Sequence, residues 1–227
     1  MIAARHSRFR HQPLNQNRHA RLNERSRQRK RRLDAVEYAR EKNGPSVGRH
    51  QIAHVDLLDP ADAARFRELE VTANIQPLWA RRDPEVVEHK LPLIGEERAA
   101  HHFPFGTLVQ AGARLAAGSD WPVTSADPLM GGYTAVTRTA PPRDIHGDEE
   151  SRTVPLEPQE RITLEQALAA YTSGAAHSLH LDHLVGRIAP DMLADLVVLD
   201  RDIRDVDALA RAQVERVYVG GELVHQC

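Results

Sequence analysis

The chain has 227 residues, 41% of them apolar and 27% charged, which is enough apolar content to build a hydrophobic core. Its longest apolar runs are too short to cross a bilayer, and its N-terminus lacks the apolar stretch of a secretory signal. These features exclude a protein with helical membrane spans and predict a cytoplasmic location. The single cysteine, Cys227, excludes an intrachain disulfide and a cysteine-based metal cage.

Charge is divided unevenly along the chain. Residues 1–32 contain eleven Arg or Lys and one acid, Glu24, whereas the remainder holds 19 bases and 31 acids. Residues 1–32 cannot bury enough apolar surface to offset chain entropy, and we predict a disordered basic segment. The acidic body and the lack of aromatic residues besides Phe9 disfavour nucleic acid as a partner of this arm. A wrong reading frame in GC-rich DNA is one hypothesis for its composition.

From Leu33 onward, helix and strand signals alternate. Asn43-Gly44-Pro45 forms a helix stop, and Asp59-Pro60 supplies an N-cap with proline at the first helical position. Strands separated by helices predict right-handed βαβ units and a parallel sheet, which makes this an α/β fold. The predicted strands are residues 51–55, 71–75 and 113–117, and the predicted helices are residues 33–42, 59–70, 84–91, 105–111 and 127–137.

A loop over residues 140–159 precedes a change of pattern. Residues 163–179 predict a helix with Thr163 and Gln166 as a capping box. Beyond this helix the apolar period falls to two, and Gly220-Gly221 predicts a hairpin turn. We therefore expect a barrel-type domain over residues 33–180 and a small β module over residues 181–227. The strands expected in the module are residues 186–188, 194–199, 214–219 and 223–224.

Two polar residues follow predicted parallel strands and are candidate metal ligands. Asp120 follows the strand over residues 113–117, and a carboxylate there can bind a metal and accept a proton from bound water. The alternative is an Asp that caps a turn or helix. His54 lies at the end of the strand over residues 51–55, where the alternative is a core histidine. His177 and His180 lack a third ligand nearby, and we assign them packing or surface roles.

Four segments together resemble the amidohydrolase superfamily, and more narrowly amidohydrolase family 3, the branch that includes N-substituted formamide deformylases. The resemblance extends from about Leu33 to His225, and its most specific feature is GSDWPV followed downstream by ADLVVLD. The segments are RHQIAHV (residues 49–55), NIQP (74–77), AGSDWPV (117–123) and ADLVVLD (194–200).

The resemblance implies the C-terminal part of a (β/α)8 TIM-type barrel followed by a small β-sandwich module. It implies a divalent metal, commonly zinc, whose bound hydroxide attacks the C–N carbonyl of a small-molecule amide or formamide. His54 matches the metal-binding histidine after the sixth strand, and Asp120 matches the catalytic and metal-binding aspartate after the eighth. Gln76, Trp79 and Trp121 are the expected substrate-binding residues.

The sequence also departs from this family. A His-x-His pair after strand one, a bridging ligand near strand four and a histidine after strand five are not found. Since a catalytic zinc needs at least three protein ligands, we expect a truncated copy with weak or no activity. A half barrel would expose an unpaired edge, so aggregation or a homodimer is also expected. The alternative function is a non-catalytic interaction protein with a basic N-terminal arm.

Overall fold

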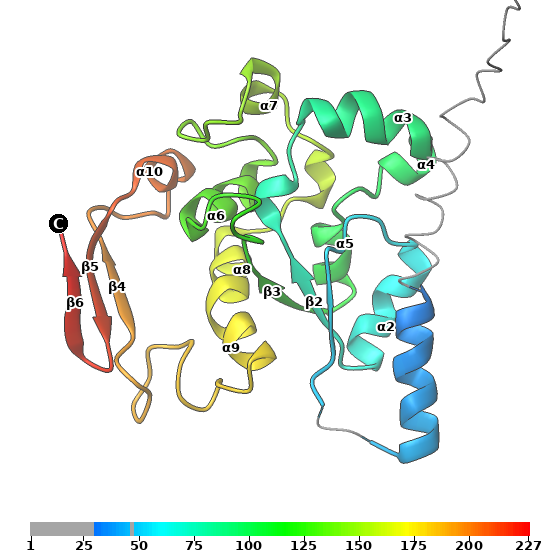
Figure 1. Cartoon of the computed structure of the whole chain (residues 1–227), viewed down its shortest axis with the longest axis horizontal. Coiled ribbons are helices and arrows are strands. Elements are labelled where there is room, and N and C mark those ends of the chain that lie inside the picture. Colours follow the sequence, from blue (N-terminus) through cyan, green and yellow to red (C-terminus); the bar gives the residue numbers. More distant parts are fainter. Residues whose placement is uncertain (1–29, 46–47) are drawn as a thin grey trace, which may run out of the picture.

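The computed structural model describes residues 30–45 and 48–227 (Figure 1). Most of the basic segment predicted to be disordered lies outside these residues. Its last part, residues 30–32, is helical, which corrects the predicted boundary at Leu33 by three residues. The described part contains a body built on a parallel sheet and, at its C-terminal end, a separate antiparallel sheet. Every helix in it is too short or too polar to span a bilayer.

The parallel sheet has the three strands that the sequence predicts. They are β1 (Gln51–Ala53), β2 (Thr72–Ile75) and β3 (Arg114–Ala117), arranged in the order β1-β2-β3. Ile52 pairs with Ala73, and Ala73 with Leu115, so these three side chains share one face of the sheet. They are 4%, 0% and 8% exposed and belong to one core cluster with Phe66 of α2 and Leu108 of α5.

Helical segments connect and cover the strands. Asp59 accepts a hydrogen bond from the N–H of Ala61, and Thr163 forms its capping box with Gln166, so both predicted caps are confirmed. Two predicted helices contain π-helical turns, η3 and η5. The elements are a helix over residues 30–43, η1 (Pro60–Asp62), α2 (Ala63–Glu68), η2 (Pro77–Trp79), η3 (Glu85–Lys90), α3 (Leu91–Ile94), α4 (Glu96–Ala99), α5 (Phe105–Gln110), α6 (Pro128–Thr137), α7 (Glu149–Thr153), η4 (Pro158–Glu160), α8 (Leu164–Ala169), η5 (Ala170–Gly174), α9 (Ala175–Ser178) and α10 (Val206–Arg211).

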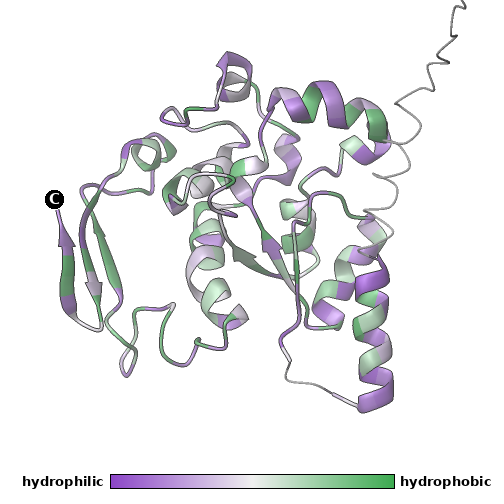
Figure 2. Ribbon diagram, viewed as in Figure 1, coloured by the Kyte–Doolittle hydropathy of each residue, from purple (hydrophilic) through white to green (hydrophobic). Residues whose placement is uncertain are grey.

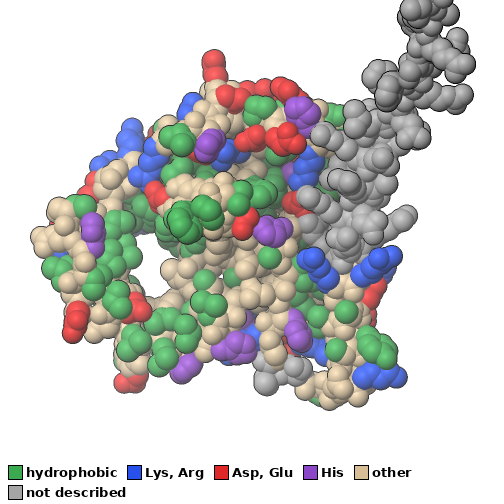
Figure 3. Space-filling model, in the orientation of Figure 1, with side chains coloured by type: hydrophobic (Ala, Val, Ile, Leu, Met, Phe, Trp, Pro, Cys, Tyr) green, Lys and Arg blue, Asp and Glu red, His purple; other side chains and the backbone are tan. Residues whose placement is uncertain are grey.

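The C-terminal module is a single antiparallel sheet of β4 (Leu196–Leu199), β5 (Val214–Val219) and β6 (Glu222–Gln226). The predicted β-sandwich is not seen in the described residues, which contain one layer here. The strand predicted over residues 186–188 is wrong: these residues form no strand, and Ile188 is 91% exposed. Hydrophobic residues occupy much of its three strands (Figure 2), and a gap separates part of the sheet from the body (Figure 3).

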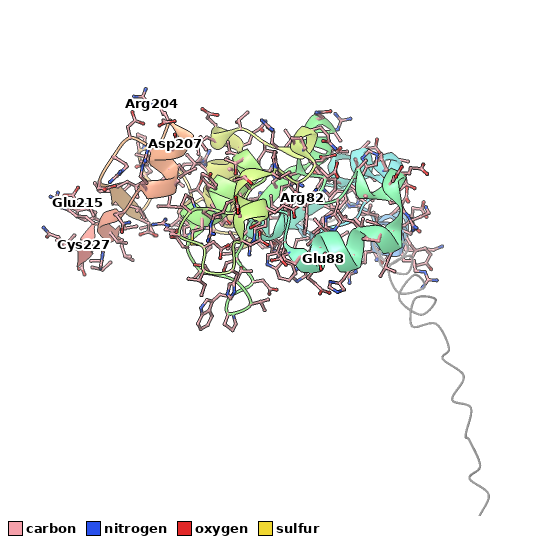
Figure 4. The ribbon with its side chains drawn as sticks, turned by 90° about the horizontal axis from the view of Figure 1, so that it is seen from above. Arg82, Glu88, Arg204, Asp207, Glu215 and Cys227 are labelled. Atoms are coloured by element: carbon pink, nitrogen blue, oxygen red, sulfur yellow. The ribbon has the colours of Figure 1, made fainter. Side chains whose placement is uncertain are left out.

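Both sheets have open edges. In the described residues β1 and β3 each pair on one side only, as do β4 and β6. Viewed from above, Arg204, Asp207, Glu215 and Cys227 of the C-terminal module all lie at one end of the molecule (Figure 4). Open edges are sites where another chain can pair. The homodimer expected from the sequence stays a prediction.

His177 belongs to an ionic cluster that joins the start of β1 to the segment after α9. Arg49 donates to Asp182 Oδ1 at 2.6 Å and to the carbonyl of His177 at 2.9 Å, and His177 Nδ1 lies 3.3 Å from Asp182 Oδ2. Hydrogen bonding by Arg49 lowers the pKa of Asp182 to about 2. Burial, assisted by Arg114 and Arg49, lowers the pKa of His177 below its ordinary 6.5.

This lowered pKa predicts a pH dependence of stability. The unfolded chain protonates His177 near pH 6.5, whereas the folded chain does so only at lower pH. The stability that the folded chain gains by keeping His177 neutral is therefore fully present above about pH 6.5 and is lost as pH falls through the folded pKa. Urea midpoints measured from pH 8 to pH 5 should fall less steeply in His177→Gln than in the wild type. The exposed His183, replaced by Gln, is the control, and equal slopes in all three proteins would contradict this account.

Candidate functional site

A cavity of about 340 Å³ opens at the C-terminal ends of the parallel strands. Four of the five predicted site residues line it, and they come from the ends of all three strands. In parallel α/β folds this end of the sheet is where binding and catalytic groups gather. The lining residues are Arg32, Ala53, His54, Val55, Asp56, Gln76, Trp79, Phe103, Phe105 and Asp120.

The two candidate ligands share an unusual backbone conformation. His54 directly follows β1 with a φ of 56°, and Asp120 lies three residues beyond β3 with a φ of 57°. Left-handed conformations cost non-glycine residues about 1–3 kcal/mol and cluster at functional sites. Both side chains are exposed to solvent at the cavity. His54 and Asp120 therefore line the same cavity from separate strands, and their role as metal ligands stays a prediction.

Side-chain amides form a chain of hydrogen bonds along the ends of β1 and β2. Asn74 Nδ2 donates to Gln51 Oε1 at 2.9 Å, and Gln76 Nε2 donates to Asn74 Oδ1 at 2.9 Å. The Gln76 Oε1 atom accepts from the backbone N–H of His54 at 3.1 Å. Gln76 was predicted to bind substrate, but its carboxamide already bonds to the protein through both ends. In this structure it bonds to the backbone N–H of His54, and the predicted substrate-binding role stays a prediction.

Replacing Gln76 should therefore loosen the site. We expect Gln76→Leu to lower the free energy of unfolding by about 1 kcal/mol, because it removes two hydrogen bonds while the His54 N–H keeps a second acceptor, the Asn74 carbonyl at 3.2 Å. Chemical denaturation measures the effect. Gln110→Leu, at an exposed position of α5, should change stability by less than about 0.5 kcal/mol. An equal loss in both variants would contradict the proposed role.

Aromatic side chains form one wall of the cavity. Trp79 lies on η2, and its ring centroid is 6.0 Å from that of His54. Phe103 and Phe105 add further apolar surface from the segment that leads into α5. Trp121, predicted to bind substrate, is 70% exposed and does not line this cavity. Its location gives no support to a substrate-binding role in this arrangement.

Asp56 also lines the cavity but is engaged in an ion pair. Its Oδ2 accepts from Lys90 Nζ at 2.7 Å, and both side chains are largely buried. Lys90 Nζ also lies 5.3 Å from the ring centroid of Phe103, a cation–π distance. The pair ties the π-helical turn η3 to the end of β1. Sequence reasoning missed Asp56 although it lies two residues after His54, the nearest available signal.

The described residues do not complete a metal site. In them no group of three or more His, Cys, Asp or Glu side chains is placed to hold one ion. His54 and Asp120 can supply two ligands, whereas structural and catalytic zinc sites need at least three from protein. The arrangement does not fit a closed zinc site by itself, and we derive no catalytic step through a metal.

The model of the amidohydrolase family matches residues 19–225. The chain belongs to the amidohydrolase family. It is 37% identical over 199 residues to the protein LONG AFTER FAR-RED 3 of Arabidopsis thaliana, covering 85% of this chain and 31% of that protein. It is 35% identical over 126 residues to the N-substituted formamide deformylase of Arthrobacter pascens, covering 55% of this chain and 21% of that enzyme.

A solved structure supports the same relationship. An uncharacterized metal-dependent hydrolase from Pyrococcus horikoshii superposes with a TM-score of 0.59 at 25% identity, covering 75% of this chain and 32% of that one. The chain therefore spans about a third or less of the length of these relatives. The resemblance predicted from the four sequence segments is confirmed at the level of the family, and the α/β fold agrees with it. A complete barrel is not seen in the described residues.

Proposed function

We propose that this amidohydrolase chain carries part of the active site of a metal-dependent hydrolase of C–N bonds in small amides or formamides. The observation that carries the proposal is the shared cavity, where His54 and Asp120 follow two different parallel strands. Asp120, exposed at the cavity, is the carboxylate available to accept a proton from an attacking water. The metal-dependent hydrolases among the structural relatives support a divalent metal, but no step is assigned to it because the described residues offer two candidate ligands.

The chain's own residues supply the surroundings of this chemistry. The Gln76 carboxamide fixes the backbone of His54, and the aromatic wall of Trp79, Phe103 and Phe105 can pack against an apolar substituent of the substrate. With two ligands in the described residues, we expect slow turnover. The alternative of a basic nucleic-acid-binding arm rests mainly on residues outside the described part, and the comparisons give it no support.

The test is hydrolysis of N-substituted formamides at saturating zinc, followed by appearance of the amine. We expect slow turnover that is lost on chelation and reduced at least about a hundred-fold in Asp120→Asn, a magnitude typical of a general base. Asp191→Asn, an exposed aspartate outside the cavity, should keep the wild-type rate. A wild-type turnover rate no higher than that of Asp120→Asn would contradict the proposed function.

A further inference from the structure

One residue of the cavity wall comes from outside the parallel sheet and its connections. Arg32 lies in the first turns of the helix over residues 30–43 and lines the same cavity as His54 and Asp120. Its side chain is exposed. It places a positive charge at a cavity that is also lined by aromatic side chains.

The position of Arg32 is set by its neighbours on the helix. Leu33 is fully buried and belongs to the core cluster. Arg65 of α2 donates to Asp34 at 2.8 Å and to Glu37 at 2.7 Å, which clamps the start of the helix against α2. The helix is therefore anchored by the residues that directly follow Arg32, which places Arg32 at the cavity.

Asp120 lines the same cavity and is the candidate metal ligand, whereas the other acids near Arg32 have partners of their own. Asp34 pairs with Arg65 and lies 3.6 Å from Lys30, and Glu37 pairs with Arg65. Asp56, on the cavity wall, pairs with Lys90. Among residues 30–45 and 48–227, Arg32 forms no ion pair or hydrogen bond. Arg32 lines the cavity, and the fork geometry of its guanidinium suits a carboxylate.

We infer that the substrates are amides that carry a carboxylate, which Arg32 binds, together with an apolar or aromatic group that packs against Trp79, Phe103 and Phe105. This inference rests on the proposed function and names its substrate class. A volume of about 340 Å³ lies at the lower end of the range for small-molecule sites, so one aromatic group and one short charged group fill it. Neutral amides of the same shape should bind more weakly.

The test uses Trp79 as a reporter. The chain has two tryptophans, so Trp121→Phe leaves Trp79 as the single source of indole fluorescence. In this background, N-benzoylglycine and its methyl ester are titrated as matched probes that differ in one negative charge. We expect the acid to bind about three- to five-fold more tightly than the ester, the range of an exposed ion pair. The preference should disappear in Arg32→Gln and weaken as salt is raised.

Arg31→Gln is the matched control, since it removes the same charge from the adjacent position, which does not line the cavity. It should keep the preference for the acid, and circular dichroism confirms that each variant is folded. Equal binding of acid and ester, or an equal effect of the two substitutions, would overturn the inference and leave the proposed function standing. Failure of both probes to change Trp79 fluorescence would also overturn the inference, whereas loss of formamide turnover is the separate result that overturns the proposed function.

Discussion

Replacing Arg138 with Met should lower the free energy of unfolding by about 3–5 kcal/mol. Arg138 is fully buried at the C-terminal end of α6 and donates to three carbonyls, those of Leu156 at 2.8 Å, Phe103 at 3.1 Å and His102 at 3.0 Å. Burial lowers its pKa to about 10, so it stays charged at neutral pH. Met fills a similar volume but removes the donors that Arg138 supplies to these three carbonyls, of which that of Phe103 keeps a second donor, the N–H of Phe105 at 2.8 Å.

Chemical denaturation followed by circular dichroism measures this loss. Arg161→Met is the matched control, because Arg161 is exposed and donates to a single carbonyl, that of Pro158, at 2.8 Å. Its replacement should change stability by less than about 0.5 kcal/mol. Similar losses in the two variants would show that the three carbonyl contacts of Arg138 do not hold this region together. Phe103 lines the cavity, so Arg138→Met should also weaken probe binding there.

The second large loss of stability is expected on breaking a buried ion pair that joins the segment after η2 to the loop after α6. Arg81 Nη1 and Asp144 Oδ2 are 2.7 Å apart, and the two side chains are 6% and 4% exposed. Asp144→Ala leaves the buried guanidinium with only the more distant and partly exposed Asp83 carboxylate, at 3.6 Å, which should cost about 3–5 kcal/mol of unfolding free energy. The double variant Arg81→Met with Asp144→Leu should recover much of this, because it removes both charges.

A neighbouring pair supplies the control. Arg82 Nε donates to Glu150 Oε1 at 2.7 Å and joins nearly the same two segments, but its side chains are 31% and 51% exposed (Figure 4). Glu150→Ala should therefore change stability by less than about 1 kcal/mol. If Asp144→Ala proved no more harmful than Glu150→Ala in urea denaturation, burial would not be what distinguishes the pairs.

Local signals predicted much of the fold. Alternating apolar residues located β1, β2 and β3, and the side chains of Asp59 and Thr163 marked real helix starts. Other features have no local signal. Nothing in Thr137-Arg138-Thr139 indicates that its arginine is fully buried, because that depends on carbonyls from distant segments. The helix α7 was missed although Asp148 and Ser151 form a capping box within the predicted loop.

The candidate site was predictable in part. Residues that follow parallel strands share one edge of the sheet, which is why His54 and Asp120 could be predicted from sequence, whereas Gln76 was predicted from the family resemblance. The hydrogen bonds of Gln76 with His54 and Asn74 depend on strand register. The position of Arg32 at the cavity depends on how the helix over residues 30–43 packs. Trp121 was chosen for its adjacency to Asp120, but it lies outside the cavity. The catalytic and metal roles of His54 and Asp120 stay predictions.

The most direct test of the account is a zinc titration by calorimetry on His54→Ala, Asp120→Ala and the double variant. All proteins should carry Cys227→Ser, because His225 Nε2 and Cys227 Sγ lie 3.1 Å apart at the surface and offer a competing pair of ligands. The account predicts that one cation binds per chain. Each single variant should bind it at least about ten-fold more weakly, and the double variant should bind it no more weakly than the single variants do. Unchanged affinity in the single variants, or independent additive losses, would contradict a shared site.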